Sequence, residues 1–443
     1  MGTGNSEHVG LMLECLADMV LGRQRVRTST HERGPGMDFY DYESRLCRPS
    51  KVKIPDFQDG ERLNHVVFAE QFTPALLERL GRSADRIRLL SKSKEGGRFL
   101  NDLLRHKRSM LYFTQPSTRT FLSFMAACQI LGMSCAEVRD PRTSSEAKGE
   151  SQIDSIRMFS SYFDVVIMRS NVAKFAECCA YMMNDLHETS RRNIPIINGG
   201  AGSDEHPTQA LLDIYTIQRA MSYTHPRDSV HGTWFGELRH EFPDLLKGID
   251  GKKFAFCGDI CRGRTIRSLA ILLSQYENIT MYFIGPSHAT LALPREFRSR
   301  LLAHGVNVIE RNSFLDIGEH RPIIEEIDCL YMTRIQREHN TPEDEQAFGE
   351  MDFTNYKLTP ELVDRMKTHA SILHPFPRDE QFGEIPTSID VDPRAYYFRQ
   401  ARNGMWIRSA LLAYLFDVDS VIADYHQDYT SQPLDFDASA LGG

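Results

Sequence analysis

The chain has 443 residues, of which 41% are hydrophobic and 25% are charged, and its formal net charge is -8 at pH 7. This length is too great for one simple core and predicts two or three domains, while the composition is ordinary for a soluble globular protein. The negative charge disfavours a nucleic-acid partner, and no apolar run is long enough to predict a membrane span. A local basic pocket for an acidic small molecule is compatible with these numbers.

The N-terminus and the cysteines give no sign of export or of a metal site. Residues 1–5 lack a charged-then-apolar signal sequence, and the match of Gly2 and Ser6 to a myristoylation pattern is short. Nine cysteines are spread thinly along the chain, and no second Cys/His pair at zinc spacing accompanies Cys257 and Cys261. We therefore expect reduced thiols, a cytoplasmic location, and no metal or cofactor.

Residues 1–63 are mixed and polar, and we interpret them as an N-terminal extension with a helical pattern around 9–21. From residue 64, short apolar strands alternate with amphipathic helices. The predicted strands are 109–113, 165–168, 195–197, 254–257, 279–284 and 329–332, and the helices between them include 152–162, 210–219, 265–273 and 360–366. Alternation of this kind predicts parallel sheets with helices on both faces.

A helix beginning near Pro207 separates two blocks of this alternation. Residues 221–250 then interrupt the pattern as an inserted surface loop or short helical excursion. The expected fold class is α/β, with two doubly wound parallel-sheet domains that face an interdomain cleft. The expected boundaries are an extension at 1–63, a first domain at 64–206 completed by a C-terminal helix at 404–425, a second domain at 207–403, and a tail at 426–443.

The first motif with chemical meaning follows strand 109–113. The run Pro116-Ser117-Thr118-Arg119-Thr120 places hydroxyls and unbonded backbone N–H groups at the positive end of a helix dipole. Arg119 adds a planar fork that can grip two phosphate oxygens. Ser117 or Thr118 as a simple N-cap is the alternative, but four polar residues in a row favour anion binding.

Further polar residues end the next strands of the first block. Arg169 closes strand 165–168 and is either held by a structural carboxylate or presented to a ligand. His206 and Gln209 open the helix that follows the loop 199–202, and their spacing of three lets both face one point. Beside an arginine and a phosphate cradle, His206 is a candidate polariser of a carbonyl group.

The second block repeats this arrangement. Residues 258–264 follow a strand as the first turn of a dinucleotide fold would, but they lack the G-x-G-x-x-G spacing, so no nicotinamide cofactor is expected. Arg264 begins a helix, and Arg334 and Gln336 follow another strand, a set that would suit a dicarboxylate. The turn 374–378 (His-Pro-Phe-Pro-Arg) is of a kind that lines clefts.

Five motifs, taken in order, resemble the aspartate carbamoyltransferase family of the aspartate/ornithine carbamoyltransferase superfamily. They are residues 117–120, 206–209, 331–336, 374–378 and 397–404, and the resemblance covers about residues 64–425. The ornithine enzymes share the first two motifs, but they have His-Cys-Leu-Pro where this chain has His-Pro-Phe-Pro, and they lack the Arg-x-Gln of 334–336. The aspartate branch is therefore the closer match.

The resemblance implies that the chain transfers the carbamoyl group of carbamoyl phosphate to the amine of L-aspartate, which gives N-carbamoyl-L-aspartate and phosphate for pyrimidine synthesis. It assigns carbamoyl phosphate to the first domain and aspartate to the second. It also implies a homotrimer with shared active sites, and leaves open a higher assembly with regulatory or pathway subunits. The alternatives are a carbamoyltransferase for another amino acid such as ornithine, or a non-catalytic structural or regulatory homologue.

The family's contacts can be carried over residue by residue. Those to carbamoyl phosphate fall on Ser117, Thr118, Arg119, Thr120, Ser144, Lys148, Arg169, His206 and Gln209. Those to aspartate fall on Lys148, Arg169, Arg264, Arg334, Gln336 and the backbone carbonyls of Pro375 and Phe376. The residues implied to act in the chemistry are Arg119, Thr120, Lys148, Arg169 and His206. A neighbouring subunit is implied to supply Ser144 and Lys148.

Three positions depart from the family's pattern. Phe121 replaces an arginine, Gln115 stands where many members have glutamate, and His339 stands where many have arginine. The last two positions can form a charged bridge between the domains in regulated members. We therefore expect weak or absent aspartate cooperativity in the isolated catalytic trimer.

Overall fold

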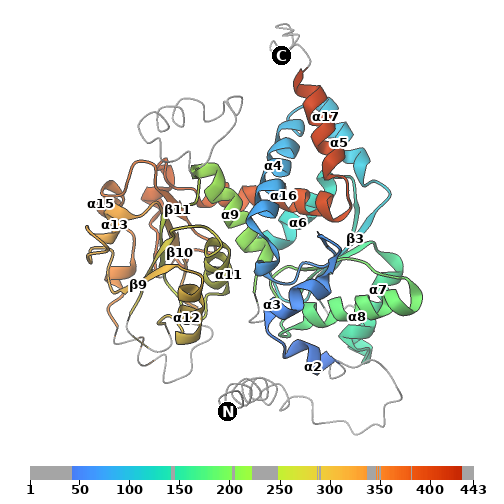
Figure 1. Cartoon of the computed structure of the whole chain (residues 1–443), viewed down its shortest axis with the longest axis horizontal. Coiled ribbons are helices and arrows are strands. Elements are labelled where there is room, and N and C mark those ends of the chain that lie inside the picture. Colours follow the sequence, from blue (N-terminus) through green and yellow to red (C-terminus); the bar gives the residue numbers. More distant parts are fainter. Residues whose placement is uncertain are drawn as a thin grey trace.

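The structure is a computed structural model that describes residues 42–431 apart from 141–144, 202–204, 222–247, 287, 289–290, 337–345, 347, 349–350 and 381. Two α/β domains lie side by side, and the helices α9 (Pro207–Met221) and α16 (Tyr397–Leu415) lie between them (Figure 1). Each domain contains a parallel sheet. The predicted α/β fold with two parallel-sheet domains is confirmed.

The sheet of the first domain has four parallel strands in the order β4-β3-β5-β6. The strands are β3 (Arg108–Phe113), β4 (Ser134–Val138), β5 (Val165–Arg169) and β6 (Ile196–Asn198). The helices of this domain are α4 (Pro74–Leu90), α5 (Lys94–Leu103), α6 (Thr118–Ile130), α7 (Gln152–Tyr162) and α8 (Phe175–Ser190). Because parallel strands share one direction, the residues that follow β3 and β5 meet at the same edge of the sheet.

The sheet of the second domain has five parallel strands in the order β11-β10-β7-β8-β9. The strands are β7 (Lys253–Cys257), β8 (Thr280–Ile284), β9 (Asn307–Arg311), β10 (Cys329–Met332) and β11 (Ser371–Leu373). Its helices include α11 (Arg264–Leu273), α12 (Arg295–Ala303), α13 (Ile323–Glu326) and α15 (Pro360–Asp364). The chain leaves β7 in one direction and returns to its other side with β10, so a topological switch point lies between β7 and β10.

Side-chain alternation along the strands explains why both sheets are covered on both faces. In β3, Leu111 and Phe113 enter one apolar cluster while Met110 and Tyr112 enter another. The same alternation divides β7, where Phe256 joins the cluster that also holds Leu111. A single apolar core therefore runs from one sheet to the other. Burial of apolar surface lowers the free energy of the folded state by about 25 cal/mol per Å², so this shared core holds the two domains together.

Residues 42–63 are part of the first domain rather than a separate extension. They form the short helices α2 (Glu43–Leu46) and α3 (Ser50–Lys53) and the hairpin β1 (Gln58–Asp59) and β2 (Arg62–Leu63). Phe57 is fully buried, and Lys53 forms a buried ion pair of 2.6 Å with Glu177 of α8. Residues 1–41 with the expected helix at 9–21, most of the insertion at 221–250, and the tail from residue 432 lie outside the described residues.

The expected C-terminal helix at 404–425 is wrong in its extent, because two helices occupy this region. α16 begins at Tyr397 and ends at Leu415, and α17 (Asp419–Ser431) follows. Asp417 between them has a left-handed backbone with φ 58°, which interrupts the helical hydrogen bonding. α16 packs on α4 and α6, so the C-terminal part of the chain does complete the first domain.

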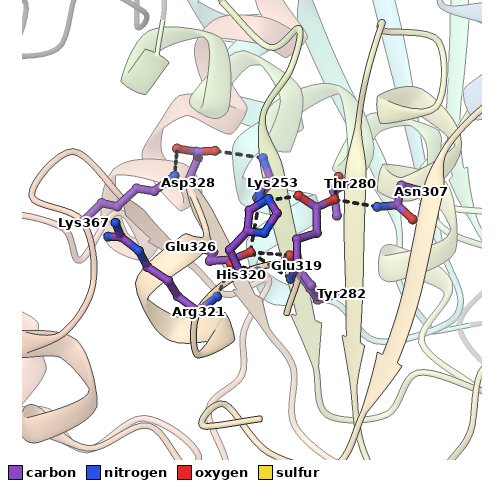
Figure 2. Close-up of polar contacts among 10 residues, drawn as sticks. All are labelled: Lys253, Thr280, Tyr282, Asn307, Glu319, His320, Arg321, Glu326, Asp328 and Lys367. Carbon is purple, nitrogen blue, oxygen red and sulfur yellow. Dashed lines mark hydrogen bonds and ion pairs between the residues drawn. The ribbon is translucent and has the colours of Figure 1, made fainter. Parts of the chain in front are cut away.

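A polar network closes the amino ends of the strands in the second sheet (Figure 2). Glu326 is its centre and accepts hydrogen bonds from the Tyr282 hydroxyl at 2.7 Å, from Lys253 Nζ at 2.9 Å, and from the backbone N–H groups of residues 319–321. Burial opposes ionisation of this carboxylate, but the hydrogen bonds from Tyr282 and Lys253 prevail and lower the pKa of Glu326 to about 2. The network is structural, since it lies at the end of the sheet opposite to the carboxyl ends of the strands.

We predict that Glu326→Gln destabilises the protein by about 2–3 kcal/mol at pH 7, because it leaves the buried Tyr282 hydroxyl and the partly buried Lys253 and backbone N–H donors without their charged acceptor. Urea denaturation followed by circular dichroism measures this loss. Since the folded-state pKa of Glu326 lies below its ordinary value of 4.5, the carboxylate contributes fully above about pH 4.5, and its contribution disappears as the pH falls through 2. Glu319→Gln is the control, because Glu319 contacts the same lysine but is more exposed, and it should cost less. Equal stability of Glu326→Gln and the wild type at pH 7 would contradict the assignment.

Candidate active site

A cavity of about 470 Å³ lies between the two domains at the carboxyl ends of their strands. The first domain contributes residues at the start of α6, the end of β5 and the start of α9, namely Ser117, Thr118, Arg119, Thr120, Arg169, His206 and Gln209. The second domain contributes Arg264, Arg334, Gln336, Pro375 and Phe376. The structure thus brings together in one cavity all but two of the residues singled out from the sequence, the exceptions being Ser144 and Lys148.

The start of α6 is suited to an anion. Ser117 occupies the N-cap position, but its side chain makes no cap hydrogen bond, so a simple cap does not account for it. The Arg119 guanidinium lies 5.4 Å from the centre of the Phe376 ring in the second domain. The helix start and Arg119 therefore form one wall of the cavity, and the turn that carries Phe376 forms the opposite wall.

Arg169 ends β5 and enters a strongly positive environment. Its Nη1 donates to the Gly199 carbonyl at 3.4 Å, and its buried Nε has no hydrogen-bond partner among the described residues. Burial, reinforced by Arg264 and Arg119, lowers the pKa of Arg169 to about 9. Converging guanidiniums are stabilised by an anion between them, which favours the ligand interpretation of Arg169 over a structural carboxylate partner.

The contacts of His206 favour one tautomer of its ring. The backbone N–H of Gln209 donates to His206 Nδ1 at 3.3 Å, so in the neutral ring the proton is on Nε2. Burial, together with the positive charge of Arg169 and Arg264, lowers the pKa of His206 well below its ordinary value. The imidazole is therefore neutral at physiological pH and can donate from Nε2 to a carbonyl oxygen.

Gly200 allows His206 and Arg169 to approach each other. Its φ is +99°, and an added Cβ would lie 2.6 Å from His206 Cδ2 and 2.8 Å from Arg169 Nη1. A side chain at this position would displace both groups, so the glycine in the loop 199–202 is required by space as well as by backbone conformation.

The second domain presents its residues on rigid supports. The backbone N–H of Gln336 donates to the buried Asp259 at 3.1 Å, which holds the segment that follows β10. In the turn 374–378, His374 Nδ1 accepts from the Phe376 N–H at 2.8 Å, and His374 Nε2 lies 2.9 Å from Glu384. Phe376 itself has a left-handed φ of 57°. The cleft-lining role expected for this turn is confirmed.

Of the expected site residues, two are not among the described residues that line the cavity. Lys148 is exposed in the 3-10 turn Ser145–Lys148 and does not line the cavity of its own chain. Ser144 lies outside the described residues. Their supply by a neighbouring subunit, which the resemblance implies, stays a prediction.

The departures from the family pattern have different structural settings. Phe121 is a core residue whose ring lies edge-on to Phe113 at 5.4 Å, and the Arg139 guanidinium lies 4.6 Å from its centre. The backbone N–H of Gln115 donates to the Arg169 carbonyl at 3.1 Å. His339 lies outside the described residues.

Sequence reasoning did not assign a site role to two polar residues of α16 that also line the cavity, Gln400 and Arg408. Arg408 is buried, and burial lowers its pKa to about 9. It contacts the Ser123 hydroxyl of α6 and lies 4.6 Å from the centre of the Phe124 ring. The sequence could have indicated this role, because Arg408 stands within the apolar run 407–415 and charged side chains are rarely buried unless they have a partner or a function.

Within the part of the chain that the structure describes, no three His, Cys, Asp or Glu side chains are grouped to hold a metal ion. In the same residues, no helix combines the length and apolarity that crossing a bilayer requires. The polar atoms that line the cavity are those of arginine, histidine, glutamine and hydroxyl side chains, together with backbone groups. Such a set suits anionic, carbonyl-bearing ligands.

Comparison with known proteins agrees with this geometry. Residues 64–219 match the carbamoyl-P binding domain of aspartate/ornithine carbamoyltransferase, and residues 250–415 match the Asp/Orn binding domain. The chain belongs to the aspartate/ornithine carbamoyltransferase family.

Similar proteins within the family are named for aspartate. A chloroplastic aspartate carbamoyltransferase of Oryza sativa is 35% identical over 80% of this chain and 85% of its own length. The catalytic subunit of Methanocaldococcus jannaschii is 36% identical over 71% of this chain and 87% of its own. A solved structure of the Trypanosoma cruzi aspartate transcarbamoylase with carbamoyl phosphate and aspartate has a TM-score of 0.65 and 29% identity, and covers 80% of this chain and 97% of that one.

We predict that Gly200→Ala lowers kcat by on the order of 100-fold, because it displaces Arg169 and His206 from their positions. Steady-state kinetics measures the effect. Gly251→Ala is the matched control, since Gly251 also has a positive φ of +71° but its added Cβ would meet nothing within 4 Å. Both variants should lose about 1 kcal/mol of stability from the left-handed backbone; Gly200→Ala should lose more because of its close contacts, and only Gly200→Ala should lose activity. Full activity of Gly200→Ala would show that this close approach is not needed.

Proposed function

We propose that the chain is an aspartate carbamoyltransferase, which transfers the carbamoyl group of carbamoyl phosphate to the amine of L-aspartate. One observation carries this proposal: Arg264, Arg334 and Gln336 of the second domain line the same cavity as the helix start and Arg169 of the first. A phosphate site and a dicarboxylate site are then adjacent, as a reaction between the two substrates requires. The matches to relatives named for aspartate support the same choice.

In the first half-site, the N–H groups that begin α6, with Ser117, Thr118 and Arg119, hold the phosphate. Thr120, Arg169 and the Nε2–H of His206 stabilise the carbonyl oxygen as it becomes negative. Gln209 binds the carbamoyl amide. Phosphate is a good leaving group, so the chain needs no covalent nucleophile, and no cofactor enters the proposal.

In the second half-site, Arg264 and Arg334 pair with the two carboxylates of aspartate, and Gln336 assists them. The carbonyls of Pro375 and Phe376 orient the amine toward the carbamoyl carbon. The departing phosphate takes the proton of the amine, so no protein base is obligatory. Fixing both substrates in one orientation supplies much of the rate enhancement.

The two alternatives are less well supported. The side chain of ornithine carries an ammonium group, which Arg334 would repel at the position where a carboxylate is expected. A non-catalytic homologue would not be expected to keep the whole set of arginines and His206 in one cavity. The test is an assay of purified protein with carbamoyl phosphate and either aspartate or ornithine, with and without a chelator. Turnover with aspartate, unaffected by the chelator, is expected; equal turnover of ornithine would overturn the proposal.

The proposal includes a homotrimer in which Ser144 and Lys148 act in the neighbouring subunit. Large apolar side chains exposed on the first domain support a contact surface there, namely Leu122, Met158, Tyr162 and Val172. Of these residues, Leu122 belongs to α6, which begins at the phosphate half-site, and Val172 follows Arg169, which lines the cavity. A subunit that binds here could bring the Lys148 turn to the cavity.

We also propose a cytoplasmic location and a place in pyrimidine synthesis. No disulfide joins any of the eight cysteines that the structure describes. This supports a reducing compartment, because disulfides persist in oxidising ones.

We predict that Arg334→Ala raises the aspartate KM by at least about 30-fold while carbamoyl-phosphate binding changes little, because losing a buried charged partner costs about 2–5 kcal/mol. Arg119→Ala should show the opposite pattern. Steady-state kinetics and calorimetric binding measure the two effects. Arg295→Ala, which removes an exposed arginine of α12 in the second domain, should change neither constant. The same defect in both site variants would refute the division into half-sites.

We predict that Lys148→Ala and Arg264→Ala are each nearly inactive as pure proteins but recover activity when they are refolded together. Random assembly of a cyclic trimer leaves about a quarter of the shared sites wholly wild type. Activity after brief mixing, after joint refolding and after slow exchange measures this recovery, and only the last two should show it. Persistent inactivity in trimers shown to have exchanged would place Lys148 outside the neighbour's site.

A further inference from the structure

We propose that Asp213 is a positioning residue that fixes the orientation of the amide groups of Gln209 and Gln400, and thereby makes the site select a ligand that carries an N–H donor at the carbamoyl position. The proposal rests on the proposed function, because it deepens the role of Gln209 in the carbamoyl half-site. Nothing in the amino-acid pattern singles out Asp213, which lies in the middle of α9.

Asp213 is fully buried where three elements meet. Its Oδ1 accepts from Gln209 Nε2 at 2.9 Å and from Gln400 Nε2 at 2.6 Å, and its Oδ2 accepts from the Tyr331 hydroxyl at 2.8 Å. These donors come from α9, α16 and β10. A buried carboxylate with three donors is a satisfied hub rather than an isolated charge.

The carboxylate determines which end of each amide faces it. An ionised carboxylate only accepts hydrogen bonds, so both glutamines must turn their nitrogen toward Asp213. The carbonyl oxygen of Gln209 then points away from Asp213, and Gln209 lines the cavity. An oxygen at this position can accept from the NH₂ group of a carbamoyl ligand, whereas a flipped amide would oppose one N–H group with another.

The same carboxylate reaches the aspartate half-site through Gln400. With its nitrogen on Asp213, Gln400 turns its oxygen to the backbone N–H of His374, at 2.8 Å. His374 begins the turn that carries the carbonyls of Pro375 and Phe376. Asp213 therefore sets a group in the carbamoyl half-site and supports the turn on the opposite wall.

The charges around Asp213 make its effect depend on pH. Burial raises the pKa of Asp213 to about 7, against the hydrogen bonds from Gln400, Tyr331 and Gln209 and the positive charge of Arg408. The other titratable groups that face it are Tyr331 and Cys329, both on β10, and both remain neutral there because burial raises the pKa of each. As the pH falls through about 7, the protonated carboxyl gains a donor and loses an acceptor, so the amide orientation is no longer enforced.

The test compares carbamoyl phosphate with acetyl phosphate, which carries a methyl group in place of the NH₂ group. Binding of each is measured by calorimetry without aspartate, in the wild type and in Asp213→Asn. The wild type should prefer carbamoyl phosphate, and the variant should lose about tenfold or more of this preference, chiefly through weaker carbamoyl phosphate binding. The preference of the wild type should also fall as the pH decreases from 8 to 6, a measurement that needs no variant to fold. The preference of Asp213→Asn for carbamoyl phosphate over acetyl phosphate should stay constant over this pH range.

Tyr331→Phe is the matched control, because it removes the donor on Oδ2 and leaves both amides on Oδ1. At a pH high enough to keep Asp213 ionised it should retain the wild-type preference, and because it loses a hydrogen bond that lowers the pKa of Asp213, its preference should begin to fall at a higher pH than that of the wild type. A preference that is unchanged in Asp213→Asn, or equal weakening of both ligands, would overturn the inference and leave Asp213 a purely structural group. A wild type that binds carbamoyl phosphate selectively but does not turn over aspartate would instead overturn only the proposed function.

Discussion

The site depends on the convergence of arginine side chains on one cavity between two domains. Arg119 of α6 and Arg169 of β5 come from the first domain, Arg264 of α11 from the second, and Arg408 from α16, the helix between them. Like charges repel, and the lowered pKa of Arg169 expresses burial together with the positive charge of Arg264, Arg119 and Arg408, whereas the lowered pKa of Arg408 is due to burial. The rest of the fold must therefore hold these groups in place against their mutual repulsion, and an anionic ligand relieves it.

Three kinds of contact hold the domains against this repulsion. The apolar core that contains Phe113 on one sheet and Phe256 on the other is continuous. Directional bonds add to it, such as the backbone N–H of His206 to the Ser268 hydroxyl at 3.1 Å. The ion pair between Arg300 of α12 and Glu70 of the first domain joins the domains through opposite charges. Salt does not screen the apolar contacts, and it only partly screens the ion pair between Arg300 and Glu70, because the Glu70 side chain is largely buried.

The sequence predicted the central strands and the residues that follow them, because a buried strand is a short apolar run with a clear end. The predicted strand 329–332 coincides with β10 and the predicted helix 152–162 with α7. In the two parallel sheets, the strands that were missed, β4, β9 and β11, are at the edges. β4 and β9 are partly exposed and mix polar with apolar residues, and β11 has only three residues, so none of them forms an apolar run of useful length. Arg408 and Asp213 were missed for another reason: their importance comes from partners nearly 200 residues away in the chain.

The path of α16 has a consequence for how the molecule is made. This helix starts beside the turn 374–378 of the second domain and ends against α4 and α6 of the first. While the ribosome is still synthesising the second domain, the first lacks the helix that covers its apolar face. Domains commonly mature in the order in which they are translated. Here the domain that is translated first is completed last, so neither half of the chain is a self-sufficient folding unit. A chain that stops before residue 397 lacks α16, and with it both the helix that covers the apolar face of the first domain and Arg408.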